Sequence, residues 1–191
     1  MKIITISGLD GSGKSTQISL LKDYLESQGK KVYYFHAVDF SLANKIAGNK
    51  SGESKSVTKA GWPKIILRRI FLMADIMRFK SLCKRLKKEN YDYLLSDRYF
   101  YDTVINIKYL AKNDKKLPCE KFILQPDTSI YLKADPEIIM QRERKPDQGL
   151  EYLQDKKKLY DSAAEAWNMQ IIDGNRNKEE IFEEIKETVL I

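Results

Sequence analysis

The sequence predicts an α/β fold in which a five-stranded parallel sheet is covered by helices on both faces. Short apolar runs alternate along the chain with longer segments whose apolar residues recur at helical spacing, and this alternation is typical of parallel sheets. The chain has 191 residues, of which 42% are hydrophobic and 32% charged, so it is long enough to bury one core. No repeat or linker interrupts it, and we expect a single domain over residues 1–191.

Each predicted strand is a short apolar run bounded by turn-forming or polar residues. In the first run, Ile3, Ile4 and Ile6 are followed directly by Gly8, as expected of a buried strand that enters a tight turn. The third run ends on a carboxylate, Asp97. The predicted strands are residues 2–7, 32–37, 94–97, 130–133 and 170–173.

The helices are predicted from apolar periodicity and from residues that favour helix ends. Residues 15–28 carry Ile18 and Leu25 on one face and end before Gly29, which favours a helix stop. Asp135, followed by a proline, is typical of a helix start. Further helices are predicted at residues 62–90, 101–111 and 150–167 and in the acidic C-terminal segment.

The longest helix, residues 62–90, has an apolar stripe that could face the core or a second copy of the chain. The stripe consists of Ile66, Ile70, Met73, Met77, Cys83 and Leu86. The polar, glycine-containing residues 41–61 before it are expected to form a mobile loop around a short helix. Residues 142–150 are charged and contain a proline, so they predict a second mobile segment.

The net charge of +7 is concentrated in one part of the chain. Residues 45–88 hold thirteen basic and two acidic side chains, a local net charge of +11. Such a stretch fits a nucleic acid, an anionic membrane surface, a phosphate ligand or a solvated helix face. The lysine-rich segments 112–116 and 156–158 are not interleaved with aromatic residues, so we expect solvated faces and no nucleic-acid partner.

Composition also indicates where the protein works. No apolar stretch approaches the roughly 18 to 20 residues of a membrane span, and Met1 leads directly into the first strand. Neither Cys83 nor Cys119 has His or Cys neighbours at metal-ligand spacing. We expect a cytoplasmic protein with reduced thiols, no structural zinc and no membrane partner.

Residues 8–15 carry the clearest chemical signal. They read Gly-Leu-Asp-Gly-Ser-Gly-Lys-Ser, which fits G-x-x-x-x-G-K-[ST] between a predicted strand and helix. The glycines let backbone N–H groups face phosphate oxygens, Lys14 can neutralise the outer phosphates, and Ser15 can ligate Mg²⁺. The pattern predicts a P-loop NTPase three-layer sandwich that uses ATP and Mg²⁺. The predicted ATP-binding residues are Gly8, Gly11, Ser12, Gly13, Lys14, Ser15 and Thr16.

A second polar group closes the third strand. Asp97 would lie at the carboxyl end of a strand beside the phosphate loop, where a magnesium-bound water can be held. Arg98 adds a guanidinium that can clamp an oxyanion with two hydrogen bonds. An ordinary surface ion pair at a strand end is the alternative.

Together these motifs resemble the thymidylate kinase family of nucleoside monophosphate kinases. The likeness covers nearly the whole chain in order, and it rests on residues 6–17, 71–75 and 96–99, on Arg142 and Arg144 in a lid position, on Tyr160, and on residues 172–173. It implies Mg²⁺-dependent transfer of the ATP γ-phosphoryl group to a nucleoside monophosphate, above all dTMP, with dTDP as product. Family members commonly dimerise through helices, which makes a homodimer a further expectation.

The resemblance also implies roles for single residues. Lys14 and Ser15 hold ATP and magnesium, Arg98 grips the acceptor phosphate, and Asp10 faces the acceptor sugar. Lys14 is the only cation within the loop, and family members with glycine at the place of Gly11 take a further cation from the lid. The predicted catalytic residues are Lys14, Arg98, Arg142, Arg144 and Asp10, and Ser15 and Asp97 are the predicted metal-site residues.

The sequence departs from the family pattern where the acceptor base would bind. The family's Ala-Asp-Arg reads Ala-Asp-Ile here, so Ile76 replaces the arginine that contacts thymine. Leu72 aligns with an aromatic residue that commonly stacks on thymine, although Phe71 is adjacent. We therefore expect weaker discrimination between dTMP and other monophosphates. The predicted acceptor-binding residues are Asp10, Asp39, Phe71, Leu72, Arg98, Thr103 and Asn106.

Two other functions remain open from the sequence. In a deoxynucleoside kinase, Asp39 would act as the base after the second strand, although the acidic Asp10 in the phosphate loop argues against that reading. A degenerate family member would bind nucleotide without phosphoryl transfer. The single histidine, His36, has no assigned catalytic role.

Overall fold

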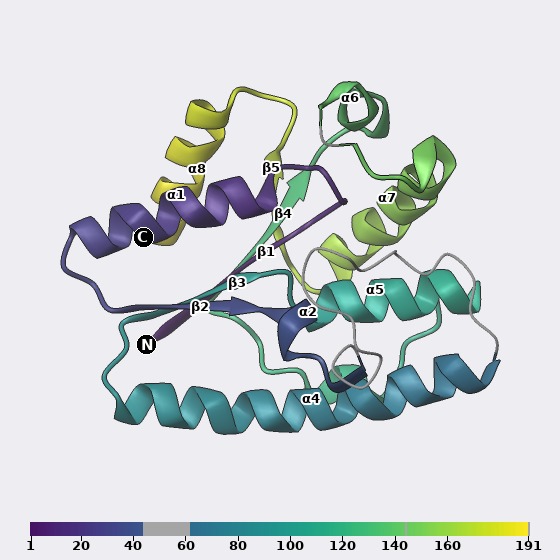
Figure 1. Cartoon of the computed structure of the whole chain (residues 1–191), viewed down its shortest axis with the longest axis horizontal. Coiled ribbons are helices and arrows are strands. Elements are labelled where there is room, and N and C mark those ends of the chain that lie inside the picture. Colours follow the sequence, from purple (N-terminus) through teal and green to yellow (C-terminus); the bar gives the residue numbers. More distant parts are fainter. Residues whose placement is uncertain (44–61, 144, 191) are drawn as a thin grey trace.

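The computed structural model describes residues 1–43, 62–143 and 145–190 (Figure 1). Most of the loop predicted at 41–61 and the lid residue Arg144 therefore lie outside the described residues. Within the described ranges, no helix is both long and apolar enough to cross a membrane.

All five predicted strands are present, and every pair is parallel. The strand order is β2-β3-β1-β4-β5, so the first strand lies at the centre of the sheet. Three predicted boundaries shift: the second strand ends one residue earlier, the third begins one residue earlier, and the fourth begins two residues earlier. The strands are β1 (Lys2–Ser7), β2 (Val32–His36), β3 (Tyr93–Asp97), β4 (Thr128–Lys133) and β5 (Gln170–Asp173).

Helices cover both faces of this sheet, which confirms the predicted three-layer α/β fold. Figure 1 shows α1 and α8 on one side of the sheet and α4 with α5 on the other. The short α2 and the 3-10 helix η1 were not predicted, since one turn of helix carries too little periodicity to be recognised. The helices are α1 (Lys14–Ser27), α2 (Ala37–Phe40), α4 (Trp62–Lys88), α5 (Phe100–Ala111), η1 (Pro118–Phe122), α6 (Pro136–Gln141), α7 (Gly149–Ala166) and α8 (Lys178–Leu190).

The strands are apolar on both faces because each face lies under helices. Ile3 packs into the core beneath α4, α5 and α7, whereas its neighbour Ile4 packs with α1 and α8. Leu94 and Leu95 of β3 divide between the two cores in the same way. The alternation of side chains along a strand thus anchors both helical layers to one sheet.

The predicted stripe of α4 faces the core only in part. Cys83 and Leu86 are buried and Met73 packs against the core, whereas Ile66, Ile70 and Met77 are exposed. The other buried residues of α4 are Ile65, Leu72, Asp75, Ile76, Phe79 and Leu82. The sequence carries adjacent apolar pairs along this helix, so periodicity alone could not decide which member of each pair faces the core. Packing decides it, because Phe79 joins the ring cluster of Phe35 and Phe100 at centroid separations of 4.8 and 5.2 Å.

The two cysteines are free thiols inside the core. The expected core position of Cys83 on the buried side of α4 is confirmed. Burial raises the pKa of Cys83 to about 11, so its thiol stays protonated at neutral pH.

We predict that Ile76→Ala lowers the free energy of unfolding by about 2–4 kcal/mol, because it leaves a cavity at a side chain that is 1% exposed. Ile171→Ala is the matched control, since Ile171 on β5 is 55% exposed. Its loss should stay below about 1 kcal/mol. Urea denaturation of both variants measures the difference, and equal losses would contradict the placement of Ile76 in the core.

Candidate active site

The phosphate loop joins β1 to α1 and depends on glycine at its first position. Gly8 has a φ of 151°, and a Cβ there would lie 2.6 Å from the carbonyl oxygen of Leu132 on β4. No side chain can occupy that space without displacing the central strands. Gly13, with φ 102°, immediately precedes α1, so the amino end of this helix faces the loop.

Lys14 is held inside the loop. Its side chain is buried, and its Nζ donates a hydrogen bond of 2.6 Å to the backbone oxygen of Leu9. Burial and the neighbouring positive charge of Arg98 lower the pKa of Lys14. Burial removes water from this ammonium, so binding of an anion beside it is favourable because the anion offsets the cost of desolvation.

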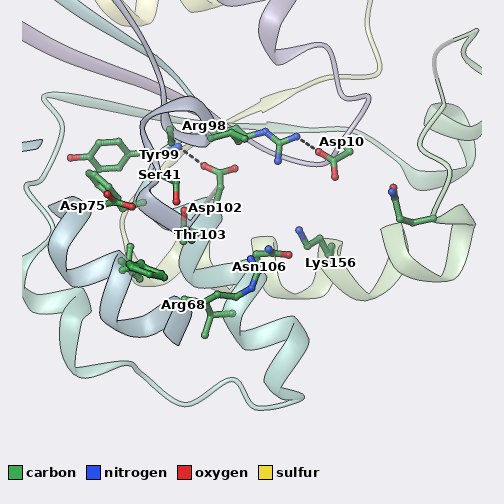
Figure 2. A pocket seen from close by; sticks show the side chains of 18 of the residues that line it. Asp10, Ser41, Arg68, Asp75, Arg98, Tyr99, Asp102, Thr103, Asn106 and Lys156 are labelled. Carbon is green, nitrogen blue, oxygen red and sulfur yellow. Dashed lines mark hydrogen bonds and ion pairs between the residues drawn. The ribbon is translucent and has the colours of Figure 1, made fainter. Parts of the chain in front are cut away.

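An ion pair joins the phosphate loop to the end of β3. Arg98 Nη2 donates to Asp10 Oδ1 (Figure 2). The hydroxyl of Tyr152 on α7 donates to Asp10 Oδ2 at 3.1 Å. Burial by itself raises the pKa of Asp10, but the positive charges of Arg98 and Lys14 outweigh it and hold the pKa well below its usual range. Asp10 is therefore a carboxylate at neutral pH. Arg98 has a φ of 65°, a strained left-handed conformation that directs the chain away from the strand.

Beside this pair lies a cavity of about 280 Å³. Its walls come from the phosphate loop, the end of β3, and helices α2, α4, α5 and α7. Six of the seven predicted acceptor-binding residues line it, namely Asp10, Phe71, Leu72, Arg98, Thr103 and Asn106. Figure 2 shows Asp75 and Ser41 at one end and Asp10 with Lys156 at the other.

Asp39 does not line the cavity. It belongs to α2, where its half-exposed carboxylate oxygen Oδ2 lies 2.9 Å from Nδ1 of His36. Ala37 and Val38 of the same helix line the cavity instead. The one-turn helix after β2, which the sequence did not predict, accounts for the difference.

At the Asp75 end of the cavity, the residue in the place of the family's arginine does not line the wall. Ile76 lies in the core, and its neighbour Asp75 lines the cavity. The Asp75 carboxylate accepts hydrogen bonds from the backbone N–H of Leu42 at 3.1 Å and from Arg78 Nη1 at 2.6 Å. Burial nevertheless raises its pKa above the ordinary value. Arg68, two turns before Asp75, also lines the cavity.

The structure also corrects the picture of residues 156–158 as a solvated face. Lys156 is only 4% exposed and lines the cavity, whereas Lys157 pairs with Asp135 at 2.6 Å and Lys158 is exposed. A signal was available in the sequence: position 156 lies one turn from each of two buried tyrosines, Tyr152 and Tyr160. The basic residues 112–116 are exposed, as expected.

A buried carboxylate, Asp102, fixes α5 and α7 around the cavity. Its Oδ2 accepts hydrogen bonds from Ser7 Oγ and the backbone N–H of Tyr99, both at 2.7 Å. Its Oδ1 accepts one of 2.6 Å from the hydroxyl of Tyr160. Both oxygens are thus engaged by the protein, which indicates a structural role for Asp102.

The predicted magnesium-site residues suit a metal ion that arrives with a nucleotide. Asp97 is buried, its Oδ1 has no hydrogen-bond partner among the described residues, and its Oδ2 accepts a bond of 3.3 Å from Tyr34. Ser15 lies exposed in the first turn of α1, next to Thr16. The described residues hold no group of three or more His, Cys, Asp or Glu side chains that could bind a metal ion. Mg²⁺ bound with phosphates needs few protein ligands, so a hydroxyl and an unsatisfied carboxylate oxygen fit it.

Arg142 reaches the phosphate loop from the segment after α6. Its Nη1 donates to the backbone oxygen of Gly11 at 2.6 Å, and its Nη2 donates to that of Gly174 at 2.9 Å. These contacts place the guanidinium against the loop, outside the cavity that the acceptor residues line.

Comparison with known proteins identifies a consistent group of relatives. The family model described as thymidylate kinase matches residues 6–185. The chain is 25% identical over 188 residues to the probable thymidylate kinase 1 of Saccharolobus solfataricus, covering 96% of this chain and 94% of that one. It is 29% identical over 199 residues to the thymidylate kinase of Thermosipho africanus, with 97% and 96% coverage. The solved thymidylate kinase of Candida albicans aligns with a TM-score of 0.69 at 19% identity, over 99% of this chain and 91% of that one.

We predict a pH-dependent stability difference between the wild type and Asp10→Asn. The pKa of Asp10 is lowered in the folded state, so its contribution is complete above the ordinary carboxyl pKa of about 4 and is lost as pH falls through the folded value. At pH 7, Asp10→Asn should lower the free energy of unfolding by about 1–3 kcal/mol, since the pair is partly exposed. Below about pH 4 the two curves should converge. A constant difference down to pH 2 would contradict the ion pair.

Proposed function

This chain belongs to the thymidylate kinase family, and from that premise we propose that it transfers the γ-phosphoryl group of ATP to dTMP. An oxygen of the dTMP phosphate attacks the γ-phosphorus, the bond to the β-phosphate oxygen breaks, and dTDP and ADP are the products. The observation that carries this proposal is the cavity beside the phosphate loop, whose Asp10–Arg98 end is adjacent to Lys14.

The donor site is the phosphate loop. Gly8, Gly11, Ser12 and Gly13 provide the backbone that surrounds the phosphates, and Lys14 and Ser15 contact their oxygens, with Thr16 next in the helix. When bound, Mg²⁺ neutralises charge on the phosphates of ATP. Ser15 and Asp97 would hold it, with Asp97 acting through its unsatisfied Oδ1.

The acceptor site is the cavity, and its polarity orients the substrate. The phosphate of dTMP would lie at the Arg98 end, where the guanidinium can exchange part of its contact with Asp10 for phosphate oxygens. The base would extend toward Phe71 and Leu72 between α4 and α5. Thr103 and Asn106 of α5 and Arg68 of α4 supply polar groups along its edge.

The chemical step requires little covalent chemistry from the protein. Phosphoryl transfer passes through a loose transition state, so catalysis consists of positioning the two nucleotides in line and neutralising the charge that spreads over the transferred group. Lys14 supplies one cation from the loop. Arg142, already at the backbone of Gly11, and Arg144 of the same segment are the further cations that we assign to this group.

The arrangement disfavours the deoxynucleoside kinase alternative, because Asp39, its required base, does not line the cavity. A chain that binds nucleotides without phosphoryl transfer is the second alternative. The two alternatives and the proposed function predict different results in the same assay.

We also propose that the protein acts as a cytoplasmic homodimer without nucleic-acid or membrane partners. The exposed apolar side of α4, formed by Trp62, Ile66, Leu67, Ile70 and Met77, supports a contact between two copies. The two free thiols are consistent with a reducing compartment.

The proposed function predicts that ATP and dTMP give dTDP, with a higher kcat/KM for dTMP than for dUMP, dCMP or dGMP and no turnover of thymidine. Lys14→Ala should lower kcat at least about a thousandfold without unfolding the protein, because it removes a cation from the transferred group. Lys22→Ala is the control, because Lys22 is a partly exposed lysine of the same helix that pairs with Glu26.

Each alternative has its own result in that assay. Turnover of thymidine without turnover of dTMP would establish a nucleoside kinase. Binding of ATP with no transfer to any acceptor would establish a non-catalytic protein, and full activity of Lys14→Ala would contradict the assigned donor site.

The lid assignment predicts that the double variant Arg142→Ala/Arg144→Ala loses about a hundredfold or more in kcat, with a smaller change in ATP affinity. Arg176→Ala is the control, since Arg176 is a surface residue paired with Glu184. Stopped-flow measurement of a single turnover separates the chemical step from product release. A double variant that keeps kcat and only raises the KM for ATP would contradict a catalytic role.

A further inference from the structure

Lys156 is a buried lysine, and none of the sequence motifs explains why it is buried. It lies in the middle of α7, is 4% exposed, and lines the cavity together with Asp10 and Arg98. Figure 2 shows it on the Asp10 side of the cavity, beside Asn106 and below the Arg98–Asp10 pair. Its Nζ lies over the ring of Tyr152, 5.2 Å from the ring centroid.

The described carboxylates around Lys156 are already committed to other groups. Asp10 binds Arg98 and Tyr152, and both oxygens of Asp102 are taken by Ser7, Tyr99 and Tyr160. In residues 1–43, 62–143 and 145–190, Lys156 forms no ion pair. An ammonium withdrawn from water without a partner carries a desolvation cost, which an anionic ligand in the cavity would offset.

We propose that Lys156 binds the phosphate of the nucleoside monophosphate acceptor, opposite Arg98. This assignment rests on the proposed function and adds a residue to its acceptor site. A phosphate dianion between the two cations would satisfy the ammonium and screen its repulsion from Arg98 and Lys14. Neither the sugar nor the base of the acceptor carries a negative charge that could do the same.

The charge of Lys156 depends on pH near neutrality, so the proposal predicts that dTMP binding also depends on pH. Burial lowers the pKa of Lys156 to about 8, with attraction from Asp10 and repulsion from Arg98 acting in opposite directions. Because only the protonated form attracts phosphate, affinity for dTMP should fall as pH rises through this range. By linkage, bound dTMP raises the pKa of Lys156 and binding takes up a proton.

Several other groups face Lys156, and they must be separated from it. They are Asp10 and Lys14 of the phosphate loop, Arg98 after β3, Asp102 of α5, Arg68 of α4 across the cavity, and Tyr152 and Tyr160 of α7. Asp10 has a pKa below its usual range and Arg98 one above it, so neither titrates near pH 8. The pKa of Lys14 is also lowered, which requires a variant that moves the titration of Lys156 alone.

The test is calorimetric binding of dTMP, thymidine and ATP to the wild type, Lys156→Met and Lys158→Met at pH 7. Lys158 is the matched control, because it is two positions away on the same helix and exposed. Lys156→Met should weaken dTMP binding by about ten- to a hundredfold, the usual effect of losing a charge-assisted contact. Binding of thymidine, which lacks the phosphate, and binding of ATP should change less than about threefold. The control should bind all three as the wild type does.

Lys156→Arg provides a second readout, since arginine keeps its charge at any pH used. The wild-type affinity for dTMP should fall between pH 7 and 9.5, and this fall should disappear in both Lys156→Arg and Lys156→Met. Wild-type binding of dTMP without any loss in Lys156→Met would overturn the proposal, as would equal losses for dTMP and thymidine. An alkaline fall that persists in Lys156→Arg would show that Lys156 does not cause it and would overturn the proposed pH dependence. If the wild type binds no monophosphate at all, the proposed function fails first.

Discussion

The ion pair between Asp10 and Arg98 is the interaction on which the site depends. It joins the phosphate loop to the end of β3, and it places the Asp10 carboxylate among three cations: the partly exposed Arg98 and the buried Lys14 and Lys156. Asp10 binds Arg98 and Tyr152, and the buried carboxylates Asp97 and Asp102 also attract Lys14. In the proposed acceptor site the nucleotide phosphate binds beside these cations, so substrate binding would change the electrostatic balance of this region.

The sheet brings these groups together through its strand order. With β1 between β3 and β4, the carboxyl ends of the central strands open onto one edge, where Gly8 permits the loop to pass Leu132. The α4, α5 and α7 layer then encloses the acceptor cavity. Asp102 holds that layer by bonding Ser7 of β1 and Tyr160 of α7 at once.

Much of this could be predicted from the sequence, and the failures share a cause. The strands, the parallel α/β fold and the placement of the phosphate loop follow from local patterns that need no tertiary information. Periodicity could not identify the buried side of α4, because the helix carries adjacent apolar pairs and only packing around Phe79 selects one member of each. Ile76 was linked to the base through the family's Ala-Asp-Arg, and a sequence resemblance does not show which side chain reaches the cavity. Lys156 belongs to a run of three lysines, which predicts a solvated face. It is buried nevertheless, because it lies on the same side of α7 as the buried Tyr152 and Tyr160. Asp39 lies outside the cavity because residues 37–40 form a one-turn helix, which is too short to be detected in the sequence.

A crystal structure of the protein with dTMP and a non-hydrolysable ATP analogue tests the account most directly. We expect the dTMP phosphate within hydrogen-bond distance of Arg98, facing the γ-phosphate at Lys14, with thymine between Phe71 and Thr103. A dTMP molecule with its phosphate at the Asp75 end, or bound outside the cavity, would contradict the assigned orientation and with it the proposed path of phosphoryl transfer.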